Sequence, residues 1–113
     1  MASAIPLNTF KTIIANVITN ANTVYTAPAG VTTVVLMAQV ANVNPTQTVK
    51  VSASHIRGAN NTRLIANAQI PIQDAASLLM GKLVLEAGDG FSIQADLNNS
   101  AELSLSILET ANA

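Results

Sequence analysis

The residues that could do chemistry in this chain are few and scattered. The sequence has one histidine, His55, and no acidic residue before Asp74. Ser52 and Ser54 lie just before His55, but a hydrolytic triad also needs a carboxylate that orients the histidine, and none is near it in the sequence. We therefore interpret His55 as a surface or loop residue that donates a hydrogen bond, for example at an interface, and we predict no catalytic residue.

The acidic residues around Gly88-Asp89-Gly90 form a superficial calcium-loop pattern. Glu86, Asp89 and Asp96 could supply oxygen ligands, but the Asp-x-Asp-x-Asp-Gly spacing with its distal glutamate is missing. A hairpin turn of the Asp-Gly type explains the same residues. The chain also has no cysteine, which removes thiolate ligands and disulfides. We predict no metal site and no cofactor.

Aromatic and basic residues are too sparse to indicate binding of a nucleic acid. Phe10, Tyr25 and Phe91 are the whole aromatic content, and the five basic residues are spread along the chain. Single strands need stacking platforms over a basic groove, and duplexes need a basic footprint. Sugar sites also commonly use aromatic platforms, and three aromatic residues offer few of them. A carbohydrate-binding receptor module is therefore the least favoured of three alternatives for the function.

Charge is unusually scarce in this chain of 113 residues. Only 10% of the residues are charged, against about 25% in an average chain, while 50% are hydrophobic and the net charge is −1. Residues 1–73 carry four cations and no acid, whereas residues 74–113 carry six acids and one lysine. Either the halves form opposite faces that dock between copies, or they interleave in one fold. A surface this poor in charge favours contact with copies of itself or with a partner.

No segment indicates membrane insertion or secretion. The longest apolar run is Val34–Ala38, far shorter than the roughly 20 residues of a membrane span. The first residues lack the basic and apolar regions of a signal peptide. We predict no membrane partner.

Apolar residues mostly alternate with polar ones, which predicts half-buried strands. Turn signals rich in glycine, asparagine and proline separate them at the spacing of a sandwich or small barrel. Residues 74–80 could form one helical turn or an extended crossover, and the following Gly81 favours the crossover. We predict an all-β fold, a single antiparallel β-sandwich of jelly-roll or immunoglobulin-like type over residues 12–113. The predicted strands are 12–19, 22–26, 31–42, 47–55, 62–66, 68–72, 79–86, 90–96 and 101–109.

Residues 31–42 are apolar on both faces of the predicted strand. Strict alternation places Val35 and Met37 on one face, opposite a face that consists of Val34, Leu36, Ala38 and Val40. Such a strand is either covered on both sides by its own chain or exposes one face to another subunit. Val35 and Met37 are therefore the candidate interface residues.

The first eleven residues are predicted to form an extended arm. Ile5, Leu7 and Phe10 are apolar, and Pro6 disfavours both a helix and a central strand. An arm of this kind needs a surface to lie on. We expect Ile5, Pro6, Leu7 and Phe10 to bind a neighbouring subunit.

Two motifs carry a family resemblance that covers nearly the whole chain. They are Tyr-Thr-Ala-Pro-Ala-Gly at residues 25–30 and Leu-Glu-Ala-Gly-Asp at residues 85–89, together with the opening residues 5–12 and the closing residues 103–109. The chain resembles small virion structural proteins of tailed bacteriophages, of the cyanophage and marine myophage type. The resemblance implies structural turns and no catalytic residue. These turn residues are Pro28, Gly30, Gly88 and Asp89.

The resemblance also implies a function and a setting. The expected role is a capsid decoration or cement protein that stabilises the head through repeated contacts. The alternative is a neck, tail, fibre-attachment or baseplate component of the virion. Expected partners are the major capsid protein or neck and tail proteins, and further copies of the chain in a homo-oligomer such as a trimer. The protein would be made in the host cytoplasm and become part of the virion.

Overall fold

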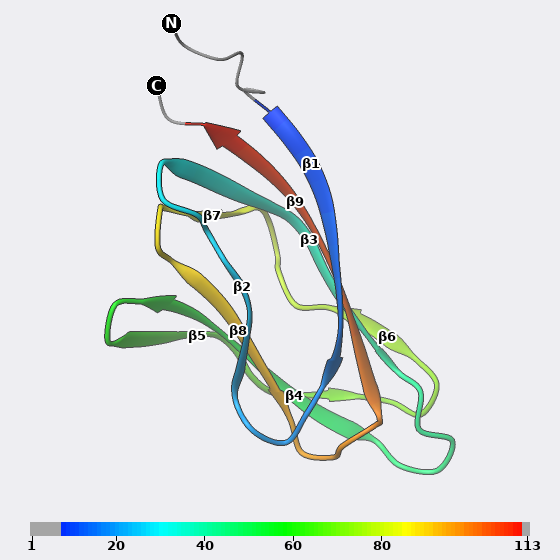
Figure 1. The fold of residues 1–113 in the computed structure, drawn as a ribbon. Coiled ribbons are helices and arrows are strands. Elements are labelled where there is room, and N and C mark those ends of the chain that lie inside the picture. The colour runs from blue at the N-terminus through cyan, green and yellow to red at the C-terminus, as the bar shows by residue number, and fades with distance from the viewer. Residues whose placement is uncertain (1–7, 112–113) are drawn as a thin grey trace, which may run out of the picture.

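The computed structural model describes residues 8–111, and this part of the chain is an antiparallel β-sandwich without a helix (Figure 1). The predicted all-β class is confirmed. Within these residues no helix is long and apolar enough to cross a membrane. The strands are β1 (Asn8–Val17), β2 (Asn22–Thr26), β3 (Val31–Asn42), β4 (Val49–Arg57), β5 (Asn60–Ile70), β6 (Ala75–Ser77), β7 (Leu83–Leu85), β8 (Gly90–Ala95) and β9 (Ala101–Ala111).

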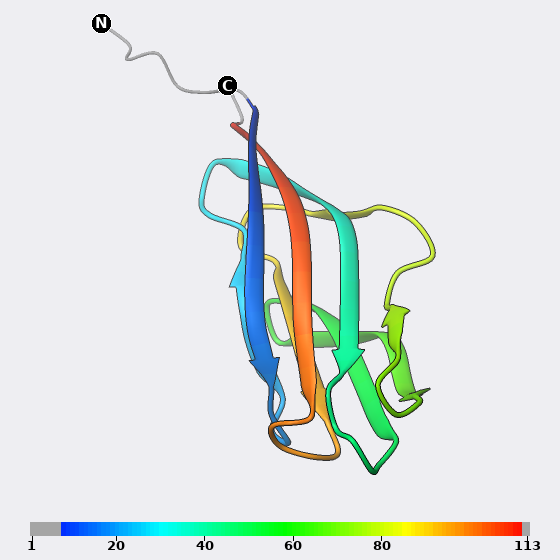
Figure 2. The same ribbon diagram turned by 90° about the vertical axis from the view of Figure 1, so that its right-hand side faces the viewer.

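The strands form two sheets, which we call sheet A and sheet B. Sheet A has the order β1-β9-β3-β6, and β7 pairs with the same edge of β3 as β6 does; sheet B has the order β2-β8-β4-β5. Each sheet therefore takes strands from both halves of the sequence. Of the two interpretations of the charge asymmetry, the interleaved one is correct, since β1 and β3 lie beside β9 in sheet A. Figure 2 shows these three strands side by side.

The core lies between the sheets and follows the predicted alternation. Every second residue of β4, β8 and β9 points inward, because successive side chains of a strand project to opposite faces. The predicted inward residues of these strands are all buried: Val49, Val51, Ala53, Phe91, Ile93, Ala95, Leu103, Leu105 and Ile107.

The segment between residues 60 and 70 is one strand, not the two strands that were predicted. Asn67 adopts a left-handed φ of 51°, and the register of β4 and β5 shifts beside it. The Asn67 amide donates a hydrogen bond of 2.9 Å to Ser52 Oγ. This side-chain acceptor replaces a ladder partner at the bulge, so β5 continues past Asn67 without breaking.

A bulge in β3 changes which residues face the core. The register against β9 shifts between Val35 and Met37, so Leu36 is the extra residue. Val35 is fully buried, whereas Met37 is 37% exposed. The prediction that Val35 and Met37 share an outward face is wrong, because the extra residue reverses the alternation within the strand. Val34 takes the outward position instead, directly opposite Leu108 and Val84.

Strand β1 begins earlier than the predicted arm allows. Phe10 and Lys11 lie inside β1, where they pair with Leu108 and Ile107 of β9. The boundary expected at residue 11 is therefore wrong, because the long β9 offers ladder partners as far as Asn8. Ile5, Pro6 and Leu7 lie outside the residues that the structure describes.

The two turn motifs lie side by side. Gly30 and Gly88 have φ values of 75° and 89°, which only glycine adopts without strain. The Val31 amide donates to the Pro28 carbonyl, and the Ala27 amide donates to the Asp89 carbonyl at 2.8 Å. In the second motif the Asp89 amide donates a hydrogen bond to the Glu86 carbonyl, which closes the turn. The predicted turns are confirmed, and backbone hydrogen bonds join them.

Candidate functional site

His55 belongs to a polar cluster centred on the Asp89 carboxylate. Asp89 Oδ2 accepts hydrogen bonds from Arg57 at 2.7 Å and from the Glu86 amide at 3.0 Å, and it lies 2.9 Å from His55 Nε2. Oδ1 accepts from Arg57 Nε at 3.0 Å. Asp89 is only 3% exposed. The cluster therefore ties β4 to the turn between β7 and β8.

The contacts of the cluster stabilise the ionised form of Asp89. The hydrogen bonds from Arg57, and after them the contact with His55, hold the pKa of Asp89 far below its ordinary value. Arg57 has a raised pKa because of the same carboxylate. Both Asp89 oxygens accept hydrogen bonds from Arg57, and Oδ2 also lies beside His55 Nε2. Within residues 8–111, no three His, Cys, Asp or Glu side chains gather into a metal-binding group.

A second polar cluster joins the two sheets through Tyr25. Its hydroxyl donates to Glu109 Oε2 at 2.6 Å and lies 2.8 Å from Thr33 Oγ1, while Lys11 Nζ lies 2.8 Å from Glu109 Oε1. Burial, and then the hydrogen bond to Glu109, raises the pKa of Tyr25 to about 12. Hydrogen bonds from Lys11 and Tyr25 lower the pKa of Glu109. These contacts link β1, β2, β3 and β9.

We expect the Tyr25 phenol of the folded protein to titrate near pH 12. Tyr25 is the only tyrosine and the chain has no tryptophan, so ultraviolet absorbance reports this one group. The raised pKa means that its stabilising contribution is intact below about pH 10 and is lost as the pH rises through 12. Glu109→Gln should lower the midpoint but leave it above 10, because burial remains. A native midpoint equal to that in urea would contradict the cluster.

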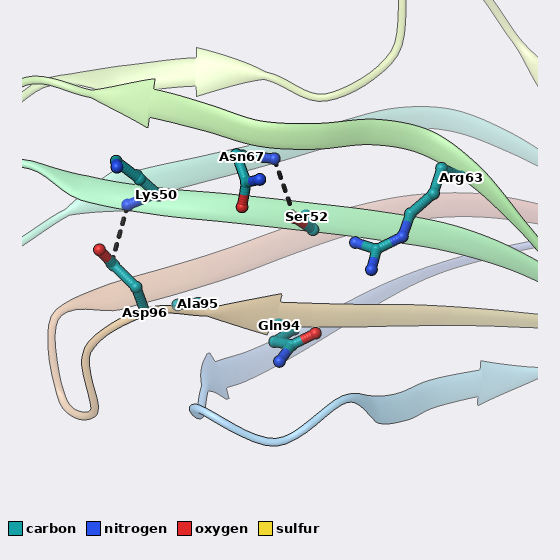
Figure 3. Close-up of a pocket in the computed structure, with 7 residues that line it drawn as sticks. All are labelled: Lys50, Ser52, Arg63, Asn67, Gln94, Ala95 and Asp96. Carbon is teal, nitrogen blue, oxygen red and sulfur yellow. Dashed lines mark hydrogen bonds between the residues drawn. The ribbon is translucent and has the colours of Figure 1, made fainter.

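A polar groove crosses the outer face of sheet B (Figure 3). It has a volume of about 190 Å³ and is lined by side chains from three strands. Lys50 and Arg63 supply positive charge, and Asp96 accepts a hydrogen bond from the Lys50 amide at 2.9 Å. The groove suits a small hydrophilic group such as a carboxylate. No aromatic ring lines it, so it has no stacking platform for a sugar.

The outer face of sheet A carries several large exposed apolar side chains, in contrast to the polar groove on sheet B. The directly paired residues Phe10, Leu108, Val34 and Val84 cross it in one row over four strands. Beside this row lie Ile14 of β1 and the bulge residues of β3. The large exposed residues of this surface, with their exposed fractions, are Phe10 (72%), Ile14 (77%), Leu36 (36%), Met37 (37%) and Val84 (51%). We call this surface the apolar face.

Two of the predicted contact residues lie on the apolar face. Phe10 and Met37 are exposed there, and Val35 is in the core. Ile14 and Val84 are further exposed residues of this surface, which the sequence did not predict. Both lie in alternating apolar stretches, where only the sheet pairing decides which side is covered by the chain's own core.

Comparison with known proteins shows a similarity of fold and none of sequence family. No family model matches the sequence, and no curated protein matches it. A solved structure from Bacillus endospore appendages, described as a novel family of disulfide-linked pili, has a similar fold with a TM-score of 0.53. The alignment covers 100% of this chain and 99% of that chain at 10% identity. The shared feature is the fold. The bacteriophage resemblance stays a prediction.

Proposed function

We propose that this chain is a non-enzymatic structural subunit that packs against other proteins in a multi-copy assembly. The observation that carries the proposal is the apolar face, where Phe10 and Ile14 are more than two-thirds exposed. Contiguous exposed apolar patches of several hundred Å² mark sites of interaction with proteins or membranes. A rigid antiparallel sandwich holds this surface in a fixed shape, so little ordering entropy is lost on binding.

Within this class we propose a capsid decoration, or cement, protein on a phage head. The motifs at residues 25–30 and 85–89 support this role through their resemblance to small phage virion proteins. Repeated copies would stabilise the shell through many modest contacts, since linked weak contacts add up to high avidity. The protein would be made in the host cytoplasm and carried in the virion.

The alternative is a neck, tail, fibre-attachment or baseplate component of the same particle. The similarity of fold to the Bacillus endospore appendage protein supports this alternative, because that protein is described as forming pili. This chain has no cysteine, so a filament built from it would be held together without disulfides.

The copy number in purified particles tests the two roles. Quantitative mass spectrometry against the major capsid protein should give hundreds of copies for a decoration protein. A few to some dozens of copies would support the neck or tail role. Absence from purified virions would overturn both roles, whatever the protein does in isolation.

Deletion of residues 1–7 tests the expectation that Ile5, Pro6 and Leu7 of the N-terminal arm bind a neighbouring subunit. The deletion leaves β1 complete, because β1 begins at Asn8. We expect an unchanged circular dichroism spectrum and unfolding midpoint, and at least a tenfold loss of incorporation into particles. The matched control replaces only Ser3 with alanine. Normal incorporation of the shortened chain would show that these residues do not hold the subunit in the particle.

A further inference from the structure

The shape of the apolar face is complementary to the same face on a second copy of the chain. The central strand β9 carries the small residues Ser104 and Ser106 on this side, and they pair directly with Ile14 and Thr12 of β1. Ser106 also pairs with Met37 on the other flank. Larger side chains on β1 and β3 therefore border a shallow trough over Ser104 and Ser106, which ends at Leu108 of the same strand. A groove of about 350 Å³, lined in part by Phe10, Leu36 and Ser106, forms one end of this trough.

The ridge beside the trough is built from the most exposed apolar side chains of β1. Ile14 is 77% exposed and Phe10 is 72% exposed. They lie on the same side of β1, because residues separated by an even number of positions in a strand share a face. A ridge of this kind on one molecule can fill the trough on another, and the reverse contact forms at the same time about a two-fold axis.

The charges on the apolar face also permit contact between identical copies. Glu102 is the only ionisable residue of β1, β3, β7 and β9 that alternates onto this side, and it lies at one end, paired with Asn16 and Ala41. Lys11 is on the other side of β1, against Glu109. A two-fold axis that runs across the strands near Ser106 places the two Glu102 residues at opposite ends, about 26 Å apart. This distance exceeds the Debye length of about 8 Å, so their repulsion is screened.

The size of the face matches that of a stable contact between two proteins. Strands β1, β3 and β9 have ten to twelve residues each and lie about 4.8 Å apart, and together with the three residues of β7 they give a footprint of about 500 Å². The accessible area of such an uneven surface is larger than its footprint, and a standard interface buries about 800 Å² on each partner. The outer face of sheet B, with Lys50 and Arg63 in its groove, is polar and a poor match for this surface. Contact of sheet A with sheet A is therefore favoured over contact of sheet A with sheet B.

We infer that the apolar face binds the apolar face of a second copy of this chain about a two-fold axis. The inference rests on the proposed structural function and names the partner of that same surface. In the resulting dimer the two sheets A form the inner layers, while both polar grooves of sheet B remain on the outside.

Sedimentation velocity over a range of concentrations tests the dimer directly. The unaltered full chain should sediment as two chains at high concentration and dissociate on dilution. Ile14→Lys places a charge at the β1 edge of the apolar face, and Val84→Lys places one at the β7 edge. Each variant should weaken association at least a hundredfold. Both positions are at least half exposed, so circular dichroism should show a folded chain. Ile72→Lys is the matched control, since Ile72 is 45% exposed in the turn after β5.

The outcomes separate this inference from the proposed function. A monomer at all concentrations, an oligomer of another mass, or a dimer unaffected by Ile14→Lys overturns the inference. A monomer that still incorporates in many copies into particles would leave the structural role standing without the dimer. A dimer that is lost in Ile14→Lys and Val84→Lys and kept in Ile72→Lys supports the inference of contact between two apolar faces. If that dimer is absent from purified virions, the dimer stands and the virion role fails.

Discussion

Val35→Lys is expected to prevent folding, whereas Met37→Lys, two positions away, leaves the sandwich intact. Val35 is fully buried in the core, where an ammonium group has neither water nor a counter-ion. An uncompensated buried charge costs more than about 4 kcal/mol, which is comparable with the whole stability of a small domain. Met37 is 37% exposed beyond the bulge, so its lysine can reach water at a cost within about 1 kcal/mol.

Urea unfolding followed by circular dichroism measures this difference. The experiment is done at low protein concentration, where association through the apolar face does not contribute to stability. Val35→Ala serves as a milder companion that should still fold with a lower midpoint. Equal tolerance of lysine at both positions would show that β3 has no bulge and that the two residues share a face.

Asp89→Asn is expected to destabilise the fold by about 2 kcal/mol, since it weakens charge-assisted hydrogen bonds at a buried position. The carboxylate accepts from Arg57, the Glu86 amide and His55. The amide that replaces it has one acceptor oxygen and places an NH₂ group against the Arg57 donors. Glu86→Gln is the control, because Glu86 meets Arg57 with a side chain that is 71% exposed. Exposed ion pairs contribute little, so its effect on the unfolding midpoint should be clearly smaller.

Asp89→Asn should also make the free energy of unfolding less dependent on pH in the acidic range. In the folded protein the pKa of Asp89 lies below the ordinary value of 3.8. A lowered pKa gives stability that is fully present above about pH 4 and is lost as the pH falls toward the folded-state value. The free energies of unfolding of the unaltered chain and of Asp89→Asn should therefore converge at low pH. A constant gap between pH 7 and pH 2 would contradict an ionised Asp89 at the centre of the cluster.

Local patterns located most of the strands, but they did not predict β6 within the expected crossover at residues 74–80, nor the polar clusters. The turns at Gly30 and Gly88 were predictable, because their geometry depends on a few neighbouring residues. Asp89 was recognised as a turn residue from the same pattern. Its contacts with His55 and Arg57 join residues more than 30 positions apart in the sequence, so no local pattern could identify them.

The sequence by itself determined the class of the fold, the alternating core of β4, β8 and β9, and a surface unusually poor in charge. The tertiary structure decided on which side each apolar residue lies. The extra residue Leu36 reversed the alternation within β3, and the length of β9 drew Phe10 into a strand. Side-chain period and turn chemistry are local properties. The pairing of distant strands decides which of two apolar faces is buried, and here it left Ile14 and Val84 exposed on one open face.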